Sequence, residues 1–71
     1  MKIIANNYEP KDIIRIIREW SGLSQKDFGK TVNCSQSTIL SYELGRRNYN
    51  IQTLMHIAKV HGITITLEKK D

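Results

Sequence analysis

The segment Leu23–Gly45, with the sequence LSQKDFGKTVNCSQSTILSYELG, decides the fold of this chain. Its first helix is predicted over 25–32, because the Ser24 hydroxyl can cap the helix and Asp27 stands three residues later, in the capping-box position. Gly29 lies inside this helix and lowers its stability by about 1 kcal/mol relative to alanine. We expect this glycine to permit the close approach of another backbone, that of the following helix.

A second helix is predicted directly after a sharp turn. Asn33 tolerates positive φ better than most residues, and such a turn requires it. Ser35 is a good helix cap and Gly45 can end the helix, so the second helix should cover 36–44. Two short helices joined by a tight turn form a unit that can place its second helix in the DNA major groove.

This second helix has two unlike faces when its residues are placed at 3.6 per turn. Ile39 and Tyr42 share the face that should point to the core. The opposite face is uncharged, whereas a merely solvated face more often carries lysine and glutamate. Its members are Ser37, Leu40, Ser41 and Leu44, with Gln36 at the margin.

Two further helices should pack around this unit. Pro10 can open the first, over 10–20, and Asn50 can cap the last, over 51–61. Each has apolar residues at helical spacing that predict a buried stripe. The stripes consist of Ile13, Ile16, Ile17 and Trp20 in the first helix and of Ile51, Leu54, Ile57 and Ala58 in the last.

The tail over 63–68 alternates apolar and polar residues, which is the period of a strand with one buried face. A lone strand leaves its backbone groups unpaired. We expect it to pair with the same strand of a second chain and to hide Ile63, Ile65 and Leu67 against the helices. Residues 3–5, of the same chain or of the second one, are the alternative partner.

Length and charge narrow the class of protein. The chain has 71 residues, enough for one small domain, and a formal charge of +4. The positive charge favours polyanionic partners, although it also suits plain solubility. There is no apolar run near the roughly 20 residues of a membrane span and no secretion signal, and the single cysteine suits a reducing compartment. We therefore expect a cytoplasmic protein without a membrane partner.

Catalytic and metal-site chemistry finds little support in the residue pattern. His56 and His61 are five residues apart on one helix and do not share a face, and Cys34 is distant from both in the sequence. No base is positioned to activate the Cys34 thiol. The sequence has neither a phosphate-binding glycine loop nor a pair of carboxylates at catalytic spacing. We therefore expect no enzyme, no metal and no other cofactor.

One ordered set of residue types extends over most of the chain. It consists of Leu23-Ser24-Gln25 and Phe28, Ser35-Gln36-Ser37-Thr38-Ile39, Tyr42-Glu43, Gly45-Arg46-Arg47, and Leu54 with Ile57-Ala58. This set resembles the phage-repressor/Cro-like (XRE-type) helix-turn-helix family. The chain departs from the usual family pattern in having Gly29 where alanine is usual, Asn33 where glycine is usual, Cys34 where a small aliphatic residue is usual, and Tyr49 where proline is common.

The resemblance, together with the predicted tail strand, gives an expected architecture. The fold should be all-α, a compact lambda-repressor-like bundle of four to five helices, with a short C-terminal β-strand used in dimer pairing. We expect three regions: an N-terminal arm or short strand over 1–9, a helix-turn-helix DNA-binding domain over 10–62, and a strand with a charged tail over 63–71.

The resemblance also implies which residues contact DNA bases. Gln36, Ser37 and Ser41 match positions that reach base edges. Leu40 replaces a common serine, and its side chain could contact a thymine methyl group or merely reduce polar readout. A glutamine amide can bond both N6 and N7 of adenine, for about 1–3 kcal/mol of discrimination, so Gln36 is the best candidate for direct readout. The alternative is that Gln36 simply suits the start of a helix.

Other positions are implied to contact phosphates or to support the fold. The phosphate candidates are Gln25, Thr38, Arg46 and Arg47 from the resemblance, with Lys30 added for its charge. Such cations add sequence-independent affinity by releasing counterions from DNA. Glu43 matches a structural acid that pairs with a basic residue of the first helix, here Arg18. Two independent surface charges are the alternative.

These expectations lead to one main function and two alternatives. The main one is a sequence-specific transcriptional regulator, by preference a repressor, that binds a two-fold symmetric operator in double-stranded DNA as a homodimer. The first alternative is an antitoxin that binds its own operator and a toxin protein. The second is a protein-interaction module whose helix face has lost DNA binding.

Overall fold

The structure is a computed structural model that describes residues 1–69. The elements, in chain order, are β1 (Lys2–Ile4), the 3-10 helix η1 (Ala5–Asn7), α1 (Pro10–Ser21), α2 (Gln25–Thr31), α3 (Gln36–Glu43), α4 (Ile51–Val60) and β2 (Thr64–Thr66). The fold is thus the expected small helical bundle with a short terminal strand. Residues 70–71 of the expected tail lie outside the described residues. Within the part described, no helix is long and apolar enough to cross a membrane.

Three of the four α-helices in residues 1–69 begin at a side-chain cap, at the positions that the sequence predicted. In each case a side-chain oxygen accepts a hydrogen bond from the backbone N–H three residues later, which satisfies a donor that the helix start leaves free. These bonds join Ser24 Oγ to Asp27 N (3.1 Å), Ser35 Oγ to Thr38 N (3.1 Å) and Asn50 Oδ1 to Thr53 N (2.7 Å). Local chemistry therefore sets where α2, α3 and α4 start.

The turn between α2 and α3 depends on two unusual backbone positions. Asn33 has a φ of 62°, the left-handed conformation predicted for it. A Cβ atom added to Gly29 would lie 2.4 Å from the carbonyl oxygen of Cys34. The backbone that approaches Gly29 most closely is therefore that of the turn and not of α3 as expected, and the Cys34 N–H also donates to the Gly29 carbonyl oxygen (2.8 Å).

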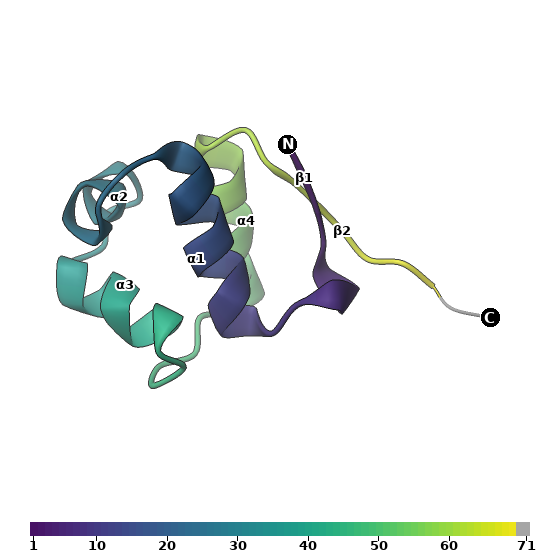
Figure 1. Ribbon diagram of the computed structural model, residues 1–71, viewed down its shortest axis with the longest axis horizontal. Coiled ribbons are helices and arrows are strands. Elements are labelled where there is room, and N and C mark those ends of the chain that lie inside the picture. Colours follow the sequence, from purple (N-terminus) through teal and green to yellow (C-terminus); the bar gives the residue numbers. More distant parts are fainter. Residues whose placement is uncertain (70–71) are drawn as a thin grey trace.

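The core lies between α1 and the elements on either side of it. Figure 1 shows α1 in the middle, with α2 and α3 on one side and the two strands on the other. Because α1 is covered from two directions, Ile14 is fully buried although the predicted stripe omitted it. Trp20, in the last turn of α1, is 41% exposed, so its assignment to the buried stripe is wrong. The buried apolar residues are Ile3, Ile13, Ile14, Ile17, Phe28, Val32, Ile39, Tyr42, Leu54, Ile57, Ala58 and Ile63.

Helix α4 differs from the prediction on one face. Leu54, Ile57 and Ala58 are buried as expected, but Ile51 is 65% exposed, so its assignment to the buried stripe is wrong. Ile51 stands in the first turn of α4, and Met55, one turn further along, is 63% exposed. The helix therefore carries an apolar face that the described chain leaves open to solvent.

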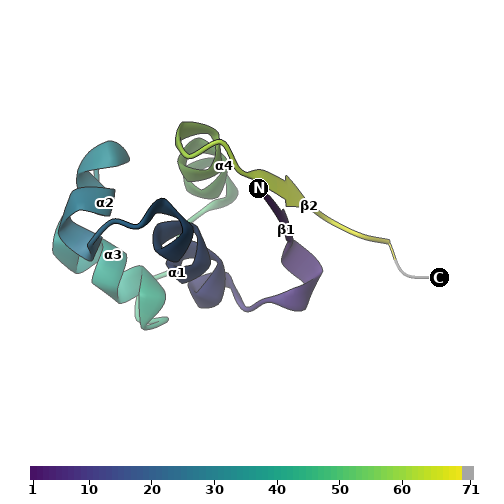
Figure 2. The ribbon, with the colours of Figure 1, turned by 45° about the horizontal axis from the view of Figure 1, so that its top comes forward.

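The two strands form a small parallel sheet within one chain. Ile3 of β1 is opposite Ile65 of β2, and the Thr64 N–H donates to the Met1 carbonyl oxygen (2.9 Å). The N-terminal segment, over 2–4, is thus the partner of the tail strand, in place of the second chain that we expected first. Both views show the strands crossing the end of the molecule away from α2 and α3 (Figures 1 and 2).

A side-chain clamp extends this pairing beyond the end of β2. The Asn6 amide group donates to the Glu68 carbonyl oxygen and accepts from the Glu68 N–H, both at 2.9 Å. The ordered strand is shorter than the predicted 63–68, and its side chains differ in burial. Ile63 is buried, Ile65 is half-buried, and Leu67 is 81% exposed. The helices of the single chain therefore do not cover Leu67, and its burial in a dimer stays a prediction.

Candidate nucleic-acid interface

The outer face of α3 presents the side chains predicted to contact bases. Gln36, Ser37 and Leu40 are exposed and Ser41 is half-buried, while Ile39, on the opposite face, is fully buried. No charged group interrupts this outer face. Short and polar side chains such as these allow a helix to approach the edges of base pairs in the major groove.

The predicted phosphate contacts lie in α3 or on the segments before and after it, and they differ in exposure and in internal hydrogen bonding. Arg46 and Arg47 follow the end of α3 and are exposed, and Lys30 is exposed at the end of α2, with its Nζ 3.9 Å from Asp27 Oδ1. Gln25 and Thr38 are half-buried, and the Thr38 hydroxyl lies 2.8 Å from Ser35 Oγ. The arginines and the lysine can therefore reach a phosphate without breaking a short internal bond.

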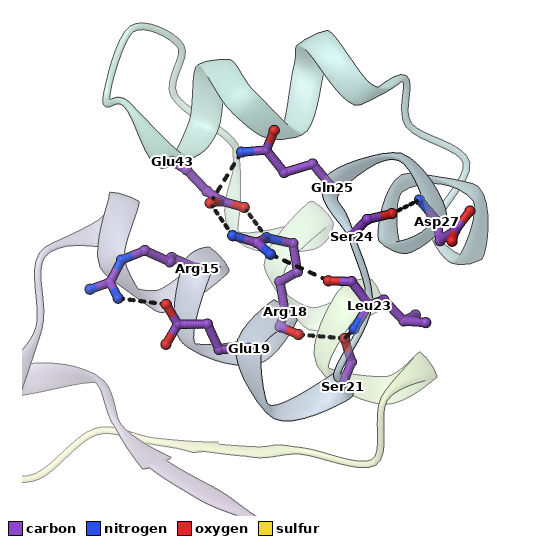
Figure 3. Close-up of polar contacts among 9 residues, drawn as sticks. All are labelled: Arg15, Arg18, Glu19, Ser21, Leu23, Ser24, Gln25, Asp27 and Glu43. Atoms are coloured by element: carbon purple, nitrogen blue, oxygen red, sulfur yellow. Dashed lines mark hydrogen bonds and ion pairs between the residues drawn. The ribbon is translucent and has the colours of Figure 1, made fainter.

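Glu43 is the only charged residue of α3, and Arg18 of α1 holds it in a two-bond ion pair. Arg18 Nε donates to Glu43 Oε2 (2.7 Å) and Nη2 donates to Oε1 (2.9 Å), as Figure 3 shows. Arg18 Nη1 also donates to the Leu23 carbonyl oxygen (3.3 Å). The two residues named from the sequence as a structural pair are thus in contact, and their contact joins α1 to α3.

The same carboxylate also orients Gln25 at the start of α2. Gln25 Nε2 lies 3.4 Å from Glu43 Oε1, so one amide hydrogen is directed to the ion pair (Figure 3). The Glu43 side chain is 6% exposed and that of Arg18 is 20% exposed. Hydrogen bonding to Glu43 raises the pKa of Arg18, which keeps the guanidinium charged. Because Arg18 neutralises Glu43, α3 presents no net negative charge to a polyanion.

Tyr49 fixes the loop after α3, a role that the sequence pattern did not reveal. Its ring meets that of Tyr42 edge-on, with centroids 5.4 Å apart, and its hydroxyl donates to the Pro10 carbonyl oxygen. Burial raises the pKa of Tyr49 to about 12, so the hydroxyl keeps its proton. The Arg47 guanidinium carbon lies 6.0 Å from the centroid of the Tyr42 ring. A tyrosine in place of the common proline was the available signal, but its hydrogen-bond partner Pro10 is 39 residues away in the sequence.

His61 has a structural environment that joins α2 to the end of α4. Its ring stacks on Phe28 with centroids 4.8 Å apart, and its Nε2 is 2.9 Å from the Thr31 hydroxyl. Burial lowers the pKa of His61, which favours the neutral ring. Among residues 1–69, no three histidine, cysteine, aspartate or glutamate side chains gather as a possible metal site.

Comparison with known proteins identifies the family. The family model described as HTH_3, helix-turn-helix, matches residues 14–67, which include all of α2, α3 and α4. No curated protein and no solved structure gave a match. The matched region contains the capped α2–turn–α3 unit and most of the core. The chain therefore belongs to the XRE-type helix-turn-helix family of DNA-binding transcriptional regulators.

Proposed function

We propose that this protein is a repressor that binds a two-fold symmetric site in double-stranded DNA as a homodimer, with α3 in the major groove. The observation that carries the proposal is the uncharged, outward face of α3 between exposed cations. An unpaired acidic side chain on α3 would repel DNA phosphates. Glu43 is the acidic residue of α3, and its charge is paired with that of Arg18. A small protein bound at a promoter can repress by occupying the site, so this activity needs no additional contact.

We assign the direct reading of sequence to the outer face of α3. Gln36 is near the start of the helix and can make a two-bond contact with adenine. Ser37 and Ser41 are short enough to bring the backbone close to the groove floor. The exposed Leu40 side chain offers an apolar contact for a thymine methyl group.

We assign sequence-independent affinity to polar and charged groups in α3 and in the segments before and after it. The phosphate contacts would come from Gln25, Lys30, Thr38, Arg46 and Arg47. Gln25 is at the first position of α2, where backbone N–H groups have no partner within the helix. One hydrogen of its side-chain amide points to Glu43, and the other would be available to a phosphate. These contacts carry no sequence information but fix the register of the helix on the duplex.

The salt dependence of duplex binding tests this proposal. Arg46→Ala combined with Arg47→Ala should weaken binding to all sequences and reduce the slope of log K against log salt by about 2, because each cation displaces about one counterion. Lys2→Ala is the matched control, because Lys2 is an exposed cation of β1. Equal slopes for the double variant and the wild type would contradict the assigned phosphate contacts.

An antitoxin role differs from this proposal in requiring a protein partner in addition to DNA. The exposed apolar face of α4, with Ile51 and Met55, is a surface that such a partner could cover. Purification from the native host separates the two functions. A toxin that co-purifies in equal amount supports the antitoxin role, and a protein that purifies alone and binds duplex DNA supports the self-contained repressor.

A further inference from the structure

A cavity of about 150 Å³ lies where the start of α1 meets the segment that follows α3. Both views show these two segments next to each other (Figures 1 and 2), and the hydrogen bond from Tyr49 to Pro10 joins them. Pockets for drug-sized ligands have volumes of about 300–1,000 Å³, so this cavity suits a group of a few atoms. The described residues that line it include two cations, Lys11 and Arg47, and none of them is acidic.

The Lys11 side chain is held against the segment that follows α3. A Cβ atom added to Gly45 would lie 3.3 Å from Lys11 Cδ, so the lysine stem occupies the space beside this glycine. The contact places Lys11 next to Arg46 and Arg47, which are assigned above to phosphates. Lys11 is exposed, and the ion pairs within residues 1–69 include neither Lys11 nor Arg47. The Lys11 ammonium group is therefore available to an anion from outside the chain.

We propose that this cavity receives a phosphate group of the DNA backbone and that Lys11 is a phosphate contact supplied by α1. This inference rests on the proposed function and adds a contact from outside the helix-turn-helix unit. A recess bordered by cations and by walls of low dielectric concentrates the field that attracts an anion. The rings of Tyr42 and Tyr49 form such walls, and the Asn48 side-chain amide can donate a hydrogen bond to a phosphate oxygen.

The position of the cavity favours a DNA phosphate over a free anion. Gly45, which contacts the Lys11 stem, is two residues beyond the end of α3, the helix assigned to the major groove. The two sugar-phosphate backbones border that groove, so the segment that leaves it passes close to phosphates. A free anion would be held by the cavity alone. In a duplex, the contacts along α3 raise the effective concentration of this phosphate at the cavity.

The salt dependence of duplex binding by Lys11→Met tests this contact. Methionine keeps most of the stem beside Gly45 but removes the charge, and the exposed position should leave the fold intact. The slope of log K against log salt should fall by about 1. Because each contact makes affinity vary as about the 0.9 power of salt, the advantage of the wild type should shrink about 3.5-fold between about 50 and about 200 mM salt.

Two further variants separate a specific contact from a change in net charge. Lys11→Arg keeps the charge and should keep the wild-type slope. Lys2→Met is the matched control, because it removes the exposed cation of β1, at the end of the molecule away from α3, and it should also keep the slope. A loss of slope in Lys2→Met equal to that in Lys11→Met would assign the effect to net charge and overturn the inference.

Duplexes with a single neutral phosphate analogue locate the contact. Each duplex carries one methylphosphonate, which lacks the phosphate charge, at a different backbone position. The wild type should lose affinity at the phosphate that Lys11 contacts, and Lys11→Met should show no further loss at that position. At all other positions the variant should show the same losses as the wild type.

Two results of these experiments would overturn the inference. One is an unchanged salt slope in Lys11→Met, and the other is a pattern of methylphosphonate losses in Lys11→Met identical to that of the wild type. With either result, a lower slope in the Arg46 and Arg47 double variant would leave the proposed function standing. A wild-type protein that binds no duplex would refute the proposed function, and this inference with it.

Discussion

Replacing Glu43 by glutamine should show how strongly its ion pair with Arg18 stabilises the packing of α3 on α1. Loss of one partner from a buried pair costs about 3–5 kcal/mol because it leaves a charge without compensation. Arg18 is 20% exposed, and glutamine can still accept one hydrogen bond, so we expect Glu43→Gln to cost about 2 kcal/mol. For a domain of this size that lowers Tm by about 8–16 °C. Thermal unfolding followed by circular dichroism at neutral pH measures the change.

The exposed pair of Arg15 and Glu19 provides a matched control. Arg15 Nη1 lies 3.0 Å from Glu19 Oε1, but both side chains are largely open to solvent. Glu19→Gln should therefore cost no more than about 0.5 kcal/mol. If Glu43→Gln and Glu19→Gln cost the same, the reasoning that burial makes the first pair important would be refuted. The double variant Arg18→Met with Glu43→Leu should recover most of the loss, because it removes both charges together.

Three other changes test the supporting structure. Gly29→Ala should lower the free energy of unfolding by about 1–3 kcal/mol in a urea titration, because the new Cβ meets the Cys34 carbonyl oxygen. This loss should outweigh the higher helix propensity of alanine. An unchanged urea midpoint would show that the turn can shift to make room. Because the pKa of His61 is lowered in the folded state, the unfolded chain binds more protons, and the free energy of unfolding should fall as the pH drops through 6.5 toward the folded-state pKa. His61→Phe should flatten this pH dependence, and an equal slope of unfolding free energy against pH in the variant and the wild type would contradict the reasoning. Asn6→Ala should speed amide exchange at Glu68 and cost about 1 kcal/mol, whereas unchanged exchange would show that the clamp does not form in solution.

The sequence predicted the elements whose causes are local. Ser24, Ser35 and Asn50 are caps, and each acts over three residues, so the starts of α2, α3 and α4 were readable from short segments. Asn33 was likewise identified from its own conformational preference. The contact between Arg18 and Glu43 joins two helices, and it was reached through the family resemblance and not through spacing.

The features that the sequence missed depend on contacts between distant segments. Strand β2 was predicted from its alternation, and residues 3–5 were the alternative to a second chain as its partner. The sequence did not decide between the two, because more than 50 residues separate β1 from β2 and no turn sets their register. The exposure of Ile51 was missed because periodicity shows which residues share a helix face and not which neighbour covers that face. The role of Tyr49 was missed for the same reason, since Tyr49 lies in the loop after α3 and its partner Pro10 is 39 residues away, at the start of α1.

Selection of duplexes from a random pool, with the wild type and with Gln36→Ala, tests the central claim that the outer face of α3 reads base pairs. The wild type should enrich a two-fold symmetric sequence with half-sites about one helical turn apart. The variant should retain that symmetry and spacing but lose its preference at one base pair in each half-site, at a cost of about 1–3 kcal/mol per pair. Failure of the wild type to enrich any sequence, or an identical preference in the variant, would contradict the claim.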